Sequence, residues 1–389
     1  MPWMHGSLFM AGGRAIKMTE FASRIRDIRL SEIRKMFEVA VEDTINLGIG
    51  EPDFNVPEHV REALKEAVDE GMTHYTSNMG MYELREAISE KLRTENRVHV
   101  EPESIIITVG ASEAIFMCTQ ALLDRGDQAL IPDPGFLSYD ACVKLAEAIS
   151  VPVPLSMEDG FSMTPERVES LITDDTRVII MNSPSNPTGS VMGKDDIKGV
   201  AEIAEDRDLI IISDEIYEKI IYDGKHYSPA CFTDNALVIN GFSKTYAMTG
   251  LRIGYVAGRE DIIEELLKVH QYNTACAPSV SQVAALAALR GPQNCVKEMV
   301  DEFKRRRDLM FRSLTEMGLK CILPGGAFYM FPQVGDSRGF TESALDAGVA
   351  VVPGSAFGEA GSDYVRMSYA TSYELIQEAM ERLKPVCGV

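Results

Sequence analysis

The chain has 389 residues and a formal net charge of −21 at pH 7, with 45% hydrophobic and 25% charged residues. This length predicts two domains of unequal size rather than a single core. The strong negative charge opposes binding to nucleic acid or anionic membranes, and no apolar run approaches the roughly 18 residues of a membrane span.

Residues 1–18 are predicted to be an N-terminal extension that the fold does not need. The apolar stretch of residues 1–13 has no basic flank and makes a poor signal peptide, and Met18 is an alternative start. The seven cysteines form no CxxC pair, and the six histidines show no metal-ligand spacing. We therefore expect a cytoplasmic protein with reduced thiols and no bound metal.

A helix is predicted over residues 20–39, and an alternation of strands and helices follows. Short apolar runs that end in turn residues predict strands at residues 104–108, 128–131, 178–181, 209–212 and 236–240. Runs that do not alternate polar with apolar residues are typical of parallel strands buried on both faces. Helical patterns lie between these strands at residues 112–123, 137–147 and 195–207. The order predicts a large α/β domain over residues 60–290, with helices on both faces of its sheet.

The C-terminal part of the chain predicts a smaller α+β domain. A long amphipathic helix is predicted over residues 295–317, and a second helix over residues 373–383. Short strands are predicted between them, at residues 327–331, 349–352 and 364–368. We assign residues 19–59 and 291–389 to this small domain and expect the helix over residues 20–39 to pack on it.

Small residues follow the first predicted strand, in the sequence TVGASEA of residues 108–114. A strand that turns on such residues into a helix leaves free backbone N–H groups at the positive helix end, which can bind an anion. An ordinary strand–helix turn explains the same pattern.

Two further motifs lie at the carboxyl ends of predicted strands, the edge where open α/β sheets bind ligands. In NSPSNPTG, residues 182–189, two prolines stiffen a loop that presents two asparagines, although a plain rigid turn has the same composition. In SDEIY, residues 213–217, Asp214 follows a buried strand and needs a partner. That partner is either a helix end that Asp214 caps or the protonated nitrogen of a bound pyridine ring.

Lys244 lies in GFSKTYAMTGLR, residues 241–252, directly after the last predicted strand of the large domain. The pKa of a lysine falls readily when the side chain is buried or near positive charge, which frees the amine as a nucleophile for an aldehyde. Ser243 and Arg252 in the same loop suit phosphate oxygens. An aldehyde that carries a phosphate describes pyridoxal 5'-phosphate (PLP); the alternative is a solvated surface lysine.

Taken together, these motifs resemble the class I/II aminotransferases, the aspartate aminotransferase-like group of fold-type I PLP enzymes, and most closely the archaeal aspartate/aromatic aminotransferases. The resemblance covers residues 25–383. It implies a mostly parallel seven-stranded sheet between helices plus a small α+β domain. Besides the motifs above, it rests on NLGIGEPDF (46–54), HY (74–75), GMYELR (80–85), GFSKTYAMTGLRIGY (241–255) and YVRMSY (364–369).

The resemblance implies a role for each matching residue toward the cofactor. Lys244 would carry PLP as a Schiff base and then act as the general base, and Asp214 would pair with the pyridine nitrogen. Asn186 and Tyr217 would hydrogen-bond the ring's phenolic oxygen. Phosphate would be held by Ala111, Ser112, Ser243 and Arg252. Phe136 would stack on the ring, and Tyr75 would reach the phosphate of the neighbouring subunit in a homodimer with shared sites.

The resemblance also implies the substrates and the reaction. Arg366 would bind the substrate α-carboxylate, helped by Asn186 and the backbone of Gly50. The expected reaction moves an amino group from an L-amino acid, aspartate or an aromatic one, to a 2-oxo acid such as 2-oxoglutarate by a ping-pong mechanism. Ser112 stands where some bacterial members that prefer acidic substrates carry lysine, and no arginine for a substrate side chain is evident. Phe136 replaces the tryptophan or tyrosine common at the stacking position.

Two alternative functions remain open at this point. The same scaffold hosts PLP-dependent C–S β-lyases, whose reaction also begins with removal of the α-proton. A PLP-sensing transcription regulator would keep the lysine but add a DNA-binding domain; no such domain is evident before residue 25, and the charge of −21 opposes DNA contact.

Overall fold

The computed structural model describes residues 10–11, 14–15, 21–26, 28 and 43–389. Most of the helix predicted over residues 20–39 therefore lies outside the described residues, and its described part forms a 3-10 turn, η1 (Ser23–Ile25). Of the predicted extension, only β1 (Met10–Ala11) and β2 (Arg14–Ala15) are described, as an antiparallel pair.

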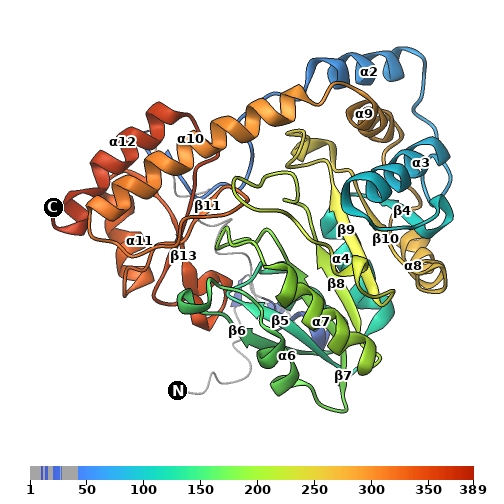
Figure 1. Cartoon of the computed structure of the whole chain (residues 1–389), viewed down its shortest axis with the longest axis horizontal. Helices are drawn as coiled ribbons and strands as arrows, with labels where there is room; N and C mark the ends of the chain where they lie inside the picture. The colour runs from blue at the N-terminus through green and yellow to red at the C-terminus, as the bar shows by residue number, and fades with distance from the viewer. Residues whose placement is uncertain (1–9, 12–13, 16–20, 27, 29–42) are drawn as a thin grey trace.

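A seven-stranded sheet forms the centre of the molecule (Figure 1), with strand order β4-β10-β9-β8-β7-β5-β6. Every neighbouring pair is parallel except the two pairs made by β10. The strands are β4 (Ile105–Thr108), β5 (Gln128–Asp133), β6 (Ile149–Pro154), β7 (Thr176–Asn182), β8 (Ile210–Asp214), β9 (Ala236–Gly241) and β10 (Gly254–Ala257). The predicted mostly parallel seven-stranded fold is confirmed.

Helices cover both faces of this sheet because successive strand residues are apolar and point to opposite sides. On one face, Ile106, Ile180 and Ile239 pack with the helices α4, α5 and α8. On the other, Ile179 and Ile211 pack with α6 and α7, while the β4 end of that face packs with α2, α3 and α9. These helices are α2 (Glu58–Asp69), α3 (Tyr82–Lys91), α4 (Ala111–Leu122), α5 (Ser138–Leu145), α6 (Pro165–Leu171), α7 (Lys194–Asp206), α8 (Glu260–Asn273) and α9 (Ser279–Arg290).

A second layer of structure, built from the C-terminal part of the chain, lies beside the carboxyl ends of the parallel strands (Figure 1). Its helices and strands are α10 (Asn294–Glu316), β11 (Tyr329–Met330), α11 (Ser337–Asp346), β12 (Val349–Ala350), β13 (Val352–Pro353), β14 (Val365–Ser368) and α12 (Tyr373–Leu383). β11, β14 and β13 form one small sheet, and β12 pairs with β3 (Ile45–Asn46) in another. The strand predicted over residues 349–352 is therefore two strands in two sheets.

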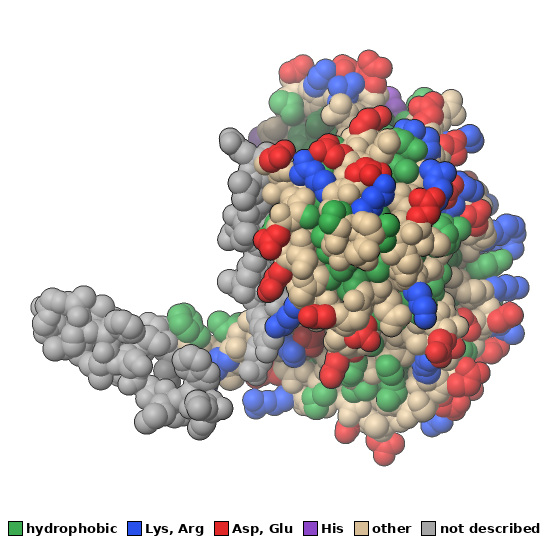
Figure 2. Space-filling view, turned by 90° about the vertical axis from the view of Figure 1, so that its left-hand side faces the viewer, with side chains coloured by type: hydrophobic (Ala, Val, Ile, Leu, Met, Phe, Trp, Pro, Cys, Tyr) green, Lys and Arg blue, Asp and Glu red, His purple; other side chains and the backbone are tan. Residues whose placement is uncertain are grey.

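The remaining described elements are short turns of helix. They are η2 (Leu92–Asn96), a π-helical turn, and the 3-10 turns η3 (Pro102–Ser104), η4 (Met157–Asp159), η5 (Pro229–Cys231), η6 (Thr249–Leu251), η7 (Gly354–Phe357), η8 (Glu359–Gly361) and η9 (Pro385–Cys387). Within the described part of the chain, no helix combines the length and apolar character needed to cross a membrane. Figure 2 shows acidic and basic side chains interspersed over one face of the molecule.

Candidate active site

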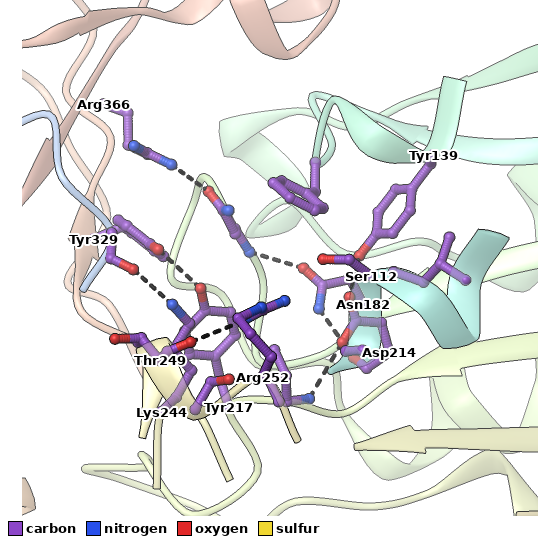
Figure 3. A pocket seen from close by; sticks show the side chains of 17 residues that line it. Ser112, Tyr139, Asn182, Asp214, Tyr217, Lys244, Thr249, Arg252, Tyr329 and Arg366 are labelled. Carbon is purple, nitrogen blue, oxygen red and sulfur yellow. Dashed lines mark hydrogen bonds between the residues drawn. The ribbon is translucent and has the colours of Figure 1, made fainter. Parts of the chain in front are cut away.

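A cavity of about 290 Å³ opens where the parallel strands end and the C-terminal layer meets them. All of the site residues predicted from the sequence line this cavity except Tyr75 (Figure 3). They are Gly50, Ala111, Ser112, Phe136, Asn186, Asp214, Tyr217, Ser243, Lys244, Arg252 and Arg366. Residues far apart in the sequence thus converge on one volume, which is at the small end of ligand-site sizes.

Lys244 lies three residues beyond the end of β9 and points into the cavity (Figure 3). Its Nζ donates a hydrogen bond of 2.6 Å to the backbone carbonyl of Gly50. Desolvation lowers the pKa of Lys244 to about 8, and the positive charges of Arg366 and Arg252 act in the same direction. A larger fraction of the amine is therefore neutral and nucleophilic near physiological pH than for an ordinary lysine.

Asp214 ends β8 and is almost fully buried at the base of the cavity. The hydroxyl of Tyr139 donates to its Oδ2 at 2.8 Å, and the Ile216 amide donates to its Oδ1 at 3.3 Å. Burial raises the pKa of Asp214 to about 6 in spite of these donors. A carboxylate in this state gains from a cationic partner in the cavity.

A chain of hydrogen bonds links Asp214 to Arg366 across the cavity wall (Figure 3). Asn182 donates its amide to the Asp214 carbonyl at 2.9 Å, and its own Oδ1 accepts the Asn186 backbone amide at 2.8 Å. The Asn186 Oδ1 then accepts from Arg366 Nη1 at 2.8 Å. The end of β7 and the proline-containing loop that follows it therefore hold the two asparagines in place.

Arg366 comes from β14 and is buried, with its guanidinium 4.6 Å from the Tyr329 ring centroid and 4.8 Å from that of Phe357. Besides Asn186 it donates to the Gly48 carbonyl, from Nη2 at 2.6 Å. Its Nε is buried and has no hydrogen-bond partner within the described residues. Burial lowers the pKa of Arg366, but a guanidinium stays charged. A buried cation thus lines the cavity with one of its donors unpaired.

The N-terminus of α4 forms a second anion-binding surface. Gly110 precedes the helix with a φ of +76°, and a Cβ on it would lie 2.7 Å from Arg252 Nη2. The helix has no side-chain cap, so its first amides, at Ala111 and Ser112, face the cavity without a capping acceptor. Ser243 lies in the same wall. The guanidinium, helix end and hydroxyls suit a phosphate group.

Tyr217 is buried beside the cavity, and its hydroxyl lies 2.8 Å from the hydroxyl of Tyr329. Desolvation, reinforced by Tyr329, raises the pKa of Tyr217 well above its ordinary value, so it stays a neutral hydrogen-bond donor. Phe136 presents its ring to the cavity and packs edge-to-face on Tyr139, with ring centroids 5.7 Å apart. At the mouth, Thr249 donates a hydrogen bond to Glu51.

Sequence reasoning missed several residues that line the cavity. They are Ile115, Tyr139, Asn182, Ile216, Thr249 and Tyr329. Asn182 and Ile216 lie inside motifs that were singled out, so a fuller reading of those motifs would have found them. Tyr329 sits in an apolar run, and nothing in its neighbours marks it as a site residue.

Tyr75 is the predicted site residue that the chain does not bring to this cavity. Its side chain is 88% exposed. It borders a separate hollow of about 870 Å³, together with residues of the segment between α8 and α9, among them Thr274 and Pro278.

The residues around the cavity fit PLP. An anion surface at α4 suits its phosphate, the buried Asp214 carboxylate suits a cationic ring nitrogen, and the Lys244 amine suits its aldehyde. The Arg366 guanidinium, which also lines the cavity, suits the carboxylate of a substrate.

Comparison with known proteins agrees with this chemistry. The sequence model of the family described as aminotransferase class I and II matches residues 42–383. The chain is 51% identical to a probable aspartate aminotransferase of Methanocaldococcus jannaschii, over 94% of this chain and 99% of that protein. It is 45% identical to the aromatic-amino-acid aminotransferase 2 of Thermococcus litoralis, over 94% of this chain and 97% of the relative.

Solved structures show the same similarity. The aspartate aminotransferase from Thermus thermophilus with maleate superposes with a TM-score of 0.92 and 39% identity, covering 95% of this chain and 100% of that one. The aromatic aminotransferase from Pyrococcus horikoshii superposes with a TM-score of 0.87 and 47% identity, covering 91% of this chain and 98% of that one.

Proposed function

The chain belongs to the class I and II aminotransferases, and from that premise we propose that it uses PLP to move an amino group from an L-amino acid to a 2-oxo acid. We propose 2-oxoglutarate as the acceptor, aspartate or an aromatic amino acid as the donor, and a ping-pong order. The observation that carries the proposal is the convergence of a low-pKa lysine, a buried aspartate and a buried arginine on one cavity.

The bound cofactor supplies an aldehyde that takes up the substrate's amino group and a ring that withdraws electrons from the Cα–H bond. In our proposal Ala111, Ser112, Ser243 and Arg252 hold its phosphate. Asp214 keeps the ring nitrogen protonated, because an ionised carboxylate in a buried site stabilises the adjacent positive charge.

The remaining ring contacts complete the binding of the cofactor. Asn186 and Tyr217 would donate hydrogen bonds to its phenolic oxygen. The Phe136 ring would pack against its pyridine ring.

Lys244 is proposed to act twice. Its amine would first anchor the cofactor and, once the substrate's amino group has replaced it, would take the proton from the substrate Cα and deliver it to the former aldehyde carbon of the cofactor, on the other side of the substrate nitrogen. The pKa of about 8 suits this work, because the neutral amine needed as a base is accessible near neutral pH.

Arg366 is proposed to bind the substrate α-carboxylate. Its guanidinium cannot rotate freely, since Asn186 and Gly48 each hold one Nη and two aromatic rings flank it. A carboxylate bound by this guanidinium would therefore be held in one orientation, which fixes the Cα–H bond relative to Lys244.

The charges that line the cavity bear on which amino acid is the donor. Among the described residues that line the cavity, the cations are Lys244, Arg252 and Arg366, and each already has a role. Half of the remaining lining residues are aromatic or aliphatic, among them Ile115 and Tyr329. This composition supports an aromatic donor, whereas the side-chain carboxylate of aspartate would need a further cation.

We also propose that the protein is a homodimer with shared sites and that residues 60–290 and the pair 19–59 with 291–389 are its large and small domains. The 88% exposure of Tyr75 supports the dimer, because a residue intended for the partner's phosphate must project from its own chain.

Mixing the PLP form with single amino acids, without any 2-oxo acid, tests the function. An amino donor should change the absorbance of the bound cofactor and release one equivalent of its 2-oxo acid, with aromatic donors more effective than aspartate. Lys244→Ala should abolish turnover but still bind PLP noncovalently, whereas Lys268→Ala, a surface lysine in an exposed ion pair, should behave as wild type. Full activity of Lys244→Ala would refute the proposal.

The β-lyase alternative predicts a different product. Incubation with cystathionine but no 2-oxo acid should yield no steady release of pyruvate and ammonia. Multiple turnovers of both products would identify a C–S lyase and overturn the aminotransferase proposal.

A further inference from the structure

Tyr329 contacts three residues that have a role in the proposed function: Tyr217, Arg366 and Gly50. It is buried, with 1% of its surface exposed, and it comes from β11, which pairs antiparallel with β14. In that register Tyr329 lies opposite Ser368. Arg366, two residues from Ser368 along β14, therefore projects from the same face of the sheet as Tyr329.

The contacts of Tyr329 are made by two different parts of its side chain. Its hydroxyl bonds the hydroxyl of Tyr217 at 2.8 Å, while the guanidinium of Arg366 lies 4.6 Å from its ring centroid. The hydroxyl also packs on Gly50 so closely that a Cβ there would overlap it. Figure 3 shows Tyr329 between Arg366 and the Lys244–Tyr217 pair.

Either hydroxyl can be the donor in the hydrogen bond between Tyr217 and Tyr329. A hydroxyl has one proton, so if Tyr329 donates to Tyr217, the Tyr217 proton is free for an acceptor in the cavity. Hydrogen bonds in such a chain strengthen one another when water is excluded. Both hydroxyls are buried, and no other hydroxyl or carboxylate in the described residues is bonded to Tyr217.

We propose that Tyr329 is a positioning residue with two separable effects: its hydroxyl aims the Tyr217 proton at the cofactor, and its ring holds the Arg366 guanidinium for the substrate carboxylate. The inference rests on the proposed function, since it concerns how Tyr217 and Arg366 are set up for their assigned partners.

A double-mutant cycle read by absorbance tests the hydroxyl effect. The pH at which the absorbance of bound PLP titrates is measured in wild type, Tyr329→Phe, Tyr217→Phe and the double variant. Tyr329→Phe should raise this midpoint by about half to one pH unit. Without the Tyr329 hydroxyl, the hydrogen bond from Tyr217 to the phenolic oxygen is weaker and stabilises the deprotonated cofactor less. In the Tyr217→Phe background the same change should have no effect. An equal shift in both backgrounds, or none in either, overturns the proposal.

Binding of 3-phenylpropanoate, a carboxylate that cannot react, tests the ring effect. Tyr329→Leu should weaken its binding about three- to tenfold, the size of a desolvated cation–π contact, whereas Tyr329→Phe keeps the ring and should bind as wild type. Equal losses in both variants would contradict the role given to the ring. The double-mutant cycle uses only phenylalanine variants, so it still tests the hydroxyl effect if Tyr329→Leu does not fold.

Tyr222→Phe is the matched structural control. Its hydroxyl bonds the carbonyl of Ala327, two residues before Tyr329, and does not line the cavity. This variant should lower the melting temperature without moving the absorbance midpoint. If its midpoint shifts as much as that of Tyr329→Phe, then a general loosening of the structure explains the shift in both variants. Should wild type bind no PLP, the proposed function itself fails, which is a different outcome from an unshifted Tyr329→Phe.

Discussion

Asp214 illustrates a conflict between stability and function within one side chain. Its pKa of about 6 in the folded chain lies above the ordinary aspartate value of 3.8, because burial disfavours the carboxylate. A folded state that binds the proton more tightly than the unfolded chain loses stability as the pH rises from about 4 to 6. At neutral pH this ionisation costs about 3 kcal/mol in the absence of a cationic partner.

Asp214→Asn should therefore stabilise the cofactor-free protein at pH 8, by up to about 3 kcal/mol, while weakening PLP binding and slowing turnover at least 100-fold. Tyr139 can still donate to the amide oxygen, so packing is retained. Thermal unfolding of the cofactor-free protein and PLP titration measure the two effects. A variant that is less stable than wild type, or that binds PLP equally well, would contradict this account of the charge.

The sequence identified Asp214 and Lys244 at strand ends more readily than the tyrosines that reach the cavity from α5 and β11. Asp214 and Lys244 follow buried apolar runs, so their polarity at a strand end stands out. Tyr139 and Tyr329 come from α5 and β11, where an aromatic residue is equally suited to the core. Only the three-dimensional packing shows that their hydroxyls face Asp214 and Tyr217.

At the scale of elements, the start of α4 depends on Gly110. Its φ of +76° favours glycine, and the space beside it is filled by Arg252. Gly110→Ala should displace the guanidinium and lower the affinity for PLP and for inorganic phosphate about tenfold or more. Gly126→Ala, which has a φ of +94° but nothing within 4 Å of a Cβ, provides the control for backbone strain alone. Similar affinities in the two variants would argue against an anion site at α4.

A buried charge network fastens the segment after β8 to the end of α3. His226 bonds Glu215 at 2.8 Å, and Lys91 forms an ion pair with Glu218. Burial disfavours the charged imidazole, but the carboxylates of Glu215 and Glu218 outweigh it and raise the pKa of His226. Lys91 and His226 overcome the effect of burial on Glu218 and lower its pKa to about 2. Asp214 and Tyr217 belong to the segment that this network holds.

His226 should make stability depend on pH. A histidine whose pKa is raised in the folded state contributes stability below its unfolded pKa, near 6.5, and loses it as the pH rises through the folded value. The melting temperature of wild type should exceed that of His226→Gln by more at pH 6 than at pH 9. A difference that is constant over this range would show that the imidazole acts without its charge.

The sequence predicted most of the buried parallel strands and the helices α4, α5, α7, α10 and α12, but not α2, α3, α8, α9 or the buried strand β10. β9 is buried at every residue, and its apolar run was evident. β6 lies at the edge of the sheet with two prolines and several exposed residues, so it lacks an apolar run. Residues 349–352 read as one strand, but the chain changes sheets at Val351, which is a matter of tertiary pairing.

For the whole molecule, the proposed dimer makes Tyr75 a residue of the partner's site. The protein should elute at twice the chain mass of 42.9 kDa. Tyr75→Ala should weaken PLP binding although the side chain is 88% exposed and outside the cavity of its own chain. Tyr272→Ala, equally exposed at 88%, is the comparison for loss of a surface aromatic. A monomer with normal PLP affinity in Tyr75→Ala would contradict shared sites.

Hybrid dimers sharpen this test. Mixing inactive Lys244→Ala chains with impaired Tyr75→Ala chains should restore some activity, because one site of each hybrid then has both residues intact. If hybrids form, as verified by mass, but activity does not recover, then Tyr75 of one chain does not complete the site that contains Lys244 of its partner.

Borohydride reduction followed by peptide mapping tests most directly the claim that Lys244 holds the cofactor until the donor's amino group displaces it. Reduction of the PLP-loaded enzyme should attach one cofactor per chain, at Lys244. The same treatment after incubation with an effective amino donor, and without a 2-oxo acid, should attach none, because the cofactor then carries the donor's amino group and has left the lysine. Attachment at another lysine, or attachment that the donor does not prevent, would contradict the account.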